Sequence, residues 1–90
     1  MANSKSAEKR VRVAARNAER NRRYRSSSRT LVKRAEIAIR EGDQDTAQDA
    51  VKRAIAALDR TASKKVIHPN NAARRKSRLM AKFNAMGQQA

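Results

Sequence analysis

Apolar residues recur at helical spacing in the second half of the chain, most regularly between residues 45 and 63. One face of a helix over this stretch would carry Ala47, Ala50, Val51, Ala54, Ile55, Leu58 and Ala62. Asp45 with Gln48 three residues later has the form of a capping box, apart from Asp in place of Ser or Thr. Lys64 and Lys65 supply cations that suit a helix C-terminus. The pattern therefore predicts a helix that begins after Gly42-Asp43 and ends near Lys64.

Two further apolar stripes predict helices before and after this one. The earlier stripe comprises Leu31, Val32, Ala35, Ala38 and Ile39. The later stripe comprises Ala72, Ala73, Leu79, Met80, Phe83 and Met86. Pro69 is well placed as the first residue of the later helix, because its fixed backbone angle and missing N–H suit that position. The connection at residues 66–68 is short, so the last two helices should pack antiparallel.

The first helix is predicted to be much longer than the others. Its only stop signal is Gly42, so it runs from about Ser6 to about Glu41 and is on the order of 50 Å long. Its first half lacks an apolar stripe and cannot bury much surface. We expect the first twenty residues to be poorly ordered alone and to become helical on a ligand.

These patterns predict an all-α fold, a three-helix bundle with a long, projecting basic N-terminal helix. The chain of 90 residues should form a single domain. Within it, residues 1–30 are predicted to form a basic helical extension and residues 31–86 the bundle core.

Charge is distributed unevenly along the chain. Residues 1–30 carry a net charge of +8, residues 31–63 are neutral overall, and residues 64–90 carry +7, which gives +15 in total. So much like charge in so small a protein repels itself and favours a polyanionic partner at both ends. Nucleic acid is the first interpretation. An anionic membrane surface is weaker, because the N-terminal half lacks the large apolar residues that such a surface would bind.

Other chemistry finds little support in the sequence. The chain has no Cys and one His, so a metal site is not expected, and the Asp43, Asp45 and Asp49 group lacks the Gly and Glu of a calcium loop. We find no catalytic set and no Gly-rich phosphate loop, and we expect neither enzymatic activity nor a cofactor. No secretory signal or membrane-spanning segment is visible, so a cytoplasmic location is expected. With only Tyr24 and Phe83 as aromatic residues, phosphate contacts should dominate over base stacking.

The residues expected to bind nucleic acid, and RNA if the family resemblance below holds, fall into two groups. The first group lies on the N-terminal helix and comprises Lys5, Lys9, Arg10, Arg12, Arg16, Arg20, Arg22, Arg23, Arg25, Ser26, Arg29 and Lys33. The second group surrounds the start of the last helix and comprises Lys64, Lys65, His68, Asn70, Arg74, Arg75, Lys76, Ser77 and Arg78. Arg predominates in the first group, and its planar fork can pair with two phosphate oxygens.

Four segments of the chain resemble the bacterial small-subunit ribosomal protein S20 family. They are residues 1–7 (MANSKSA), 25–30 (RSSSRT), 42–43 (GD) and, most specifically, 66–79 (VIHPNNAARRKSRL). Two residues depart from the family pattern, since Ser4 replaces an aliphatic residue and Pro69 replaces a basic one. The loss of a cation at position 69 removes one possible phosphate contact.

The resemblance implies a structural constituent of the small ribosomal subunit. Such a protein binds the small-subunit (16S) rRNA directly and early, supports assembly of the body of the 30S subunit, and lies against the five-prime domain and the long penultimate stem. It is expected to be a monomer within the cytoplasmic ribosome, with few protein–protein contacts. The alternative from the residues alone is a nucleoid-type DNA-binding protein, although neither a recognition helix nor a dimer interface is visible.

Overall fold

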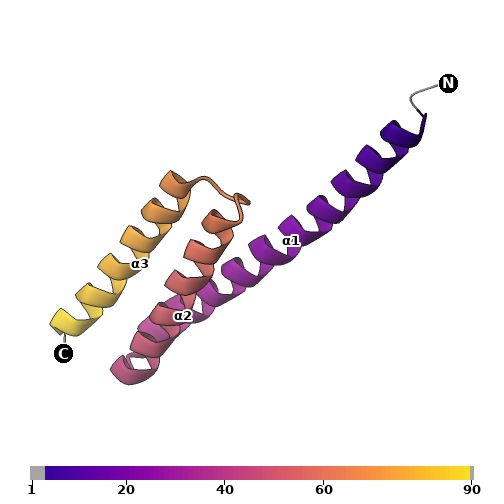
Figure 1. The fold of residues 1–90 in the computed structure, drawn as a ribbon. Coiled ribbons are helices and arrows are strands. Elements are labelled where there is room, and N and C mark those ends of the chain that lie inside the picture. The colour runs from indigo at the N-terminus through magenta and orange to yellow at the C-terminus, as the bar shows by residue number, and fades with distance from the viewer. Residues whose placement is uncertain (1–3, 90) are drawn as a thin grey trace.

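The computed structural model describes residues 4–89, which form three helices and no strand. Helix α1 spans Ser4–Glu41, α2 spans Gln44–Ser63 and α3 spans Pro69–Gln89 (Figure 1). Helix α2 turns back along the second half of α1, and α3 lies antiparallel to α2. The predicted all-α fold, its long first helix and Pro69 as the first residue of the last helix are confirmed. The first three residues of the 1–7 segment lie outside the described residues.

The molecule is elongated, because the first half of α1 extends beyond the bundle (Figure 1). Its principal extents are 68 × 20 × 13 Å and its radius of gyration is 17.9 Å. A compact domain of this length would have a radius of gyration of about 12 Å. Every side chain from Lys5 to Arg20 is exposed, so no other helix supports this part of α1.

The core is small and rich in alanine. Ala35, Val51, Ala54 and Leu79 form its centre, one or more from each helix, and Leu58 is also buried. Partly buried residues pack around this centre, namely Leu31, Val32, Ile39, Ala50, Ile55 and Phe83. Because alanine is small, it allows helices to pack closely although each residue buries little apolar surface.

The predicted apolar stripe of α3 is wrong at two positions. Ala73 and Met80 are exposed, whereas Leu79 is buried with only 2% of its surface accessible. Helix α3 packs on the bundle along a narrow line, so residues at the edges of the predicted stripe stay in solvent.

The start of α2 also differs from the prediction, because Asp43 and not Asp45 caps the helix. Asp43 has extended backbone angles, and its carboxylate accepts hydrogen bonds from the Thr46 backbone N–H at 3.3 Å and the Thr46 hydroxyl at 2.9 Å. The hydroxyl bond first, and the backbone bond second, lower the pKa of Asp43 from its ordinary value. Asp45 lies within the first turn, where its charge complements the helix dipole.

The end of α2 is closed by a left-handed lysine. Lys65 has φ +61°, its N–H bonds the Ala62 carbonyl at 2.9 Å, and the Val66 N–H bonds the Thr61 carbonyl at 3.1 Å. This pair of bonds is the Schellman arrangement, in which the left-handed position is usually glycine. The buried Val66 side chain then directs the chain into α3.

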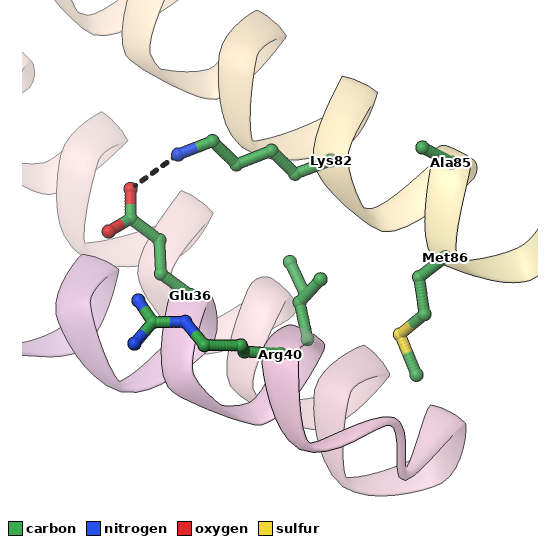
Figure 2. Close-up of a pocket in the computed structure, with 6 residues that line it drawn as sticks. Glu36, Arg40, Lys82, Ala85 and Met86 are labelled. Carbon is green, nitrogen blue, oxygen red and sulfur yellow. Dashed lines mark hydrogen bonds and ion pairs between the residues drawn. The ribbon is translucent and has the colours of Figure 1, made fainter.

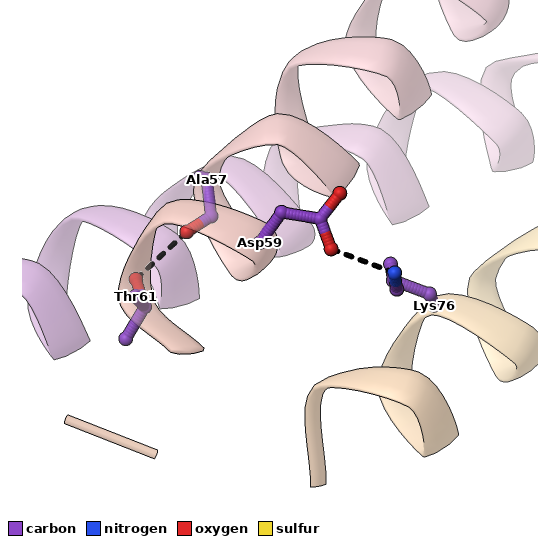
Figure 3. A network of polar contacts seen from close by, with 4 residues as sticks. All are labelled: Ala57, Asp59, Thr61 and Lys76. Carbon is purple, nitrogen blue, oxygen red and sulfur yellow. Dashed lines mark hydrogen bonds and ion pairs between the residues drawn. The ribbon is translucent and has the colours of Figure 1, made fainter. Parts of the chain in front are cut away.

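Two ion pairs tie α3 to the other helices. Lys76 contacts Asp59 of α2 at 2.6 Å (Figure 3), and Lys82 contacts Glu36 of α1 at 3.0 Å (Figure 2). In Figure 3 the buried Thr61 hydroxyl also donates to the Ala57 carbonyl, at 2.7 Å. Exposed ion pairs contribute only about 0–1 kcal/mol each, so packing at Leu79 remains the main attachment of α3.

Candidate nucleic-acid interface

The basic residues of α1 form two rows on different faces of the helix. We define the outer row as Lys5, Lys9, Arg12, Arg16, Arg20 and Arg23, and the groove row as Arg22, Arg25, Arg29 and Lys33. At 100° per residue, the mean directions of the two rows differ by about 130°. All ten side chains are exposed. One helix thus presents two separate lines of positive charge.

The groove row meets α3, which contributes Arg75 from a position 50 residues after Arg25. Two adjoining hollows of about 410 and 350 Å³ lie between these helices, and Arg29 and Arg75 line both of them. We call them together the α1–α3 groove. Its cationic lining residues are Arg25, Arg29, Lys33, Arg40 and Arg75.

Hydrogen bonds fix the position of two arginines in the α1–α3 groove. Asn71 accepts a bond from Arg75 Nε at 2.8 Å, which leaves the two terminal amino groups of that guanidinium for a ligand. Arg25 Nη2 donates to the Val66 carbonyl at 3.3 Å and so ties α1 to the turn before α3. Glu36 is the acid that lines the groove, and its charge is paired with Lys82. The groove therefore carries a strong local excess of positive charge.

Residues of the α2–α3 turn lie at one end of this groove. His68 lines it and caps α3, since its Nδ1 accepts a hydrogen bond from the Asn70 backbone N–H at 3.1 Å. A neutral imidazole that accepts at Nδ1 carries its proton on Nε2, where it can donate to a phosphate oxygen. Lys64, Lys65 and Asn70, which are close to His68 in the sequence, have exposed side chains.

The remaining predicted residues have different settings. Arg74, Ser77 and Arg78 are exposed on α3, and Arg10 and Ser26 are exposed on α1. Lys76 is turned toward Asp59 and is half-buried, so its charge is already paired within the bundle. The structure thus separates Lys76 from its neighbours in the sequence.

Several residues of the interface were not predicted. Arg40 follows Lys33 by seven residues and extends the groove row, a spacing that was visible in the sequence. Asn71 orients Arg75, and Arg60 of α2 lies next to Tyr24 and the end of the outer row. Asn71 precedes Arg75 by four residues on α3, a spacing that could have indicated their contact, whereas Arg60 gave no signal because only the packing of α2 against α1 places it there.

The described residues show little that points to another kind of site. Between residues 4 and 89, no three His, Asp or Glu side chains gather where they could hold a metal ion. Over the same residues, no helix is both long enough and apolar enough to span a membrane.

A family model and several related proteins all indicate the same family for this chain. The family described as Ribosomal protein S20 matches residues 2–84. A small ribosomal subunit protein bS20 from Roseiflexus sp. (strain RS-1) is 55% identical over 92% of this chain and 90% of its own length. Proteins of the same name from Coprothermobacter proteolyticus and Natranaerobius thermophilus are 50% and 48% identical, each over 93% of this chain and 96% of their own length. The chain therefore belongs to the ribosomal protein S20 family, whose members are structural proteins of the ribosome and not enzymes.

Proposed function

We propose that this chain binds small-subunit (16S) rRNA directly, through two basic surfaces, and supports assembly of the body of the 30S subunit. The relatives are named as small ribosomal subunit proteins, and a protein of that kind works in the cytoplasm with the ribosome. The observation that carries the proposal is the convergence of Arg25, Arg29 and Arg75 from two helices on one groove.

The first surface is the outer row, which neutralises phosphates along an RNA segment that lies beside the projecting half of α1. Its arginines can each bind two phosphate oxygens through the planar guanidinium. Because no other helix covers residues 5–20, RNA can approach this part of α1 from several sides. Binding of the RNA then supplies the support that the bundle does not.

The second surface is the α1–α3 groove, continued by Arg74 and Arg78 on α3. The sequence suggested one surface on the first helix and another near the last. In the fold, Arg25, Arg29 and Lys33 of the groove row instead line the same α1–α3 groove as Arg75, so a single RNA segment can contact both helices. The clamp we propose holds one RNA segment in this groove and another along the outer row, and α1 sets the angle between them.

In this proposal, residues 1–30 form an RNA-binding extension of a bundle core at residues 31–86. The protein acts as a monomer with few protein–protein contacts. The high positive charge supports it, because copies of the chain repel each other until RNA neutralises them. Sedimentation of the free chain should give the mass of one copy.

The test is the salt dependence of binding to a transcript of the 16S rRNA five-prime domain. The double variant R29Q/R75Q should bind more weakly, and its slope of log affinity against log salt should fall by roughly 0.7–0.9 for each phosphate that is no longer neutralised. The matched control is R53Q, because Arg53 is exposed on α2, outside the groove, and pairs with Asp49. An unchanged slope in the double variant, or an equal reduction in R53Q, contradicts the groove as an RNA site. Stronger binding of duplex DNA than of the transcript would favour a DNA-binding role instead.

A further inference from the structure

A separate hollow lies on the other side of α1, where the last turn of α2 packs against it. It has a volume of about 360 Å³ and is lined by Arg20, Arg23, Tyr24, Ser27 and Arg60. We call it the Tyr24 cleft. Arg20 and Arg23 are the last two members of the outer row, so this line of positive charge leads directly into the cleft.

The lining of the Tyr24 cleft combines an aromatic ring with three guanidinium groups. Tyr24 is half-buried, so packing holds one side of the ring while part of it stays accessible. Ser27, one turn after Arg23, leaves room beside the ring because its side chain is small. No acidic side chain is among these lining residues, although Glu19 lies 3.9 Å from Arg23 on the exposed surface of α1. The cleft is therefore positively charged and open on one side.

Core packing and the helix dipole do not by themselves explain why Tyr24 and three arginines line one cleft. A cation at the end of α2 suits the helix dipole, but Lys64 and Lys65 already supply two there. A tyrosine that served only the core would be covered by apolar neighbours, whereas Tyr24 borders a hollow with three arginines. An aromatic ring beside guanidinium groups is the combination that binds an unpaired base together with its phosphate.

We propose that the Tyr24 cleft binds one unpaired nucleotide of the RNA, with the base stacked on Tyr24 and its phosphate held by Arg23 and Arg60. This inference rests on the proposed function and adds a specificity to it. The α1–α3 groove contacts phosphates and so carries little preference for unpaired nucleotides. The Tyr24 cleft would place the protein where its RNA has a bulged or looped-out base.

The fluorescence of the protein offers a direct probe, because Tyr24 is its only tyrosine and the chain has no tryptophan. Titration with the five-prime-domain transcript should quench the tyrosine emission as the base stacks on the ring. The same titration of free N-acetyltyrosinamide corrects for light absorbed by the RNA.

Affinity measurements on the same transcript test the roles of individual residues. The Y24L variant keeps apolar packing without a ring and should lose about 5- to 150-fold in affinity, the range for one stacked base. The Y24F variant keeps the ring and should bind within about twofold of the wild type. The R60Q variant should reduce the salt slope by roughly 0.7–0.9, whereas R53Q on the same helix should leave it unchanged.

The outcomes separate this inference from the proposed function. If the wild type does not bind the transcript, both fail. If it binds, but its emission is not quenched and both Y24L and R60Q bind normally, the Tyr24 cleft is not a nucleotide site and the phosphate surfaces remain. Circular dichroism of Y24L checks its fold, and if that variant does not fold, quenching of the wild type and the R60Q slope decide the question.

Discussion

The left-handed backbone of Lys65 leads to a prediction in which stability and RNA binding change in opposite directions. A non-glycine residue with φ near +61° carries a steric cost of about 1–2 kcal/mol. Replacing Lys65 with Gly removes that cost but gives the unfolded chain more freedom, worth about 0.4–1 kcal/mol. These ranges leave a net stabilisation of about 0–1.6 kcal/mol, and the central value of about 0.8 kcal/mol corresponds to a rise in Tm of about 3–6 °C.

The same substitution removes a positive charge three residues before His68, which lines the α1–α3 groove. If Lys65 contacts one phosphate, K65G should lower the salt slope by roughly 0.7–0.9. At about 0.15 M salt, this corresponds to an affinity decrease of about four- to sixfold. A glycine would fold better at this position, so the lysine is explained if its charge serves the partner.

Thermal unfolding of the free chain and binding of the five-prime-domain transcript measure the two effects separately. The K65N variant should resemble K65G, because Asn tolerates the left-handed region without a charge, whereas K65R should behave as the wild type in both assays. K64G is the backbone control, since Lys64 has φ −83° and gains nothing from glycine. A K65G protein that is less stable than the wild type would refute the strain argument. One that is more stable and binds RNA equally well would refute the role of the charge.

Three further predictions concern other parts of the molecule. D43A should lower the Tm of the free chain through loss of the N-cap hydrogen bonds to Thr46. The pKa of Asp43 is lower in the folded state than in the unfolded chain. The stabilisation by Asp43 is therefore complete above the ordinary carboxyl pKa of about 3.9 and is lost as the pH falls through the lower, folded-state pKa. The stabilities of D43A and the wild type should converge in acid. Amide exchange over residues 5–20 should be fast in the free chain and slow with RNA, and equal protection in both states would contradict coupled ordering. E36Q should tighten RNA binding in the same transcript assay, because it removes the acid of the α1–α3 groove and frees Lys82. Weaker binding by an E36Q protein with an unchanged Tm would argue against an RNA site there.

Most of the fold was predictable because the signals along the chain are strong and agree with each other. Gly42 adopts φ +86° where the first helix was expected to stop, and Pro69 opens α3. The stripe from Ala47 to Leu58 is regular, and its members are buried or partly buried. The sequence-based prediction was wrong where two neighbouring residues could play the same structural role at similar energy. Asp43 and Asp45 can both cap a helix, and only the backbone angles of Asp43 decide between them.

The candidate site was less predictable, since a sequence shows which face of a helix a cation occupies but not what lies opposite. The periodicity of α1 separates the outer row from the groove row. It does not reveal that the groove row meets Arg75, or that Arg60 reaches the end of the outer row. The positions of Arg75 and Arg60 depend on how α2 and α3 pack against α1. Much of that packing uses alanine, whose small side chain gives little indication in the sequence of which helix it contacts.

The ion pairs within the bundle reduce the number of cations on α3 that are available to the proposed RNA partner. Lys76 and Lys82 are cations that the sequence counts with the basic C-terminal segment, yet they pair with Asp59 and Glu36 from the neutral middle of the chain. Helix α3 carries a strong positive charge and would otherwise be repelled by the basic face of α1. The acids at these two positions offset part of that repulsion, although packing at Leu79 remains the main attachment of α3. Arg74, Arg75 and Arg78 are exposed on α3 and are available for the proposed contacts with RNA, whereas the ammonium groups of Lys76 and Lys82 are paired with Asp59 and Glu36.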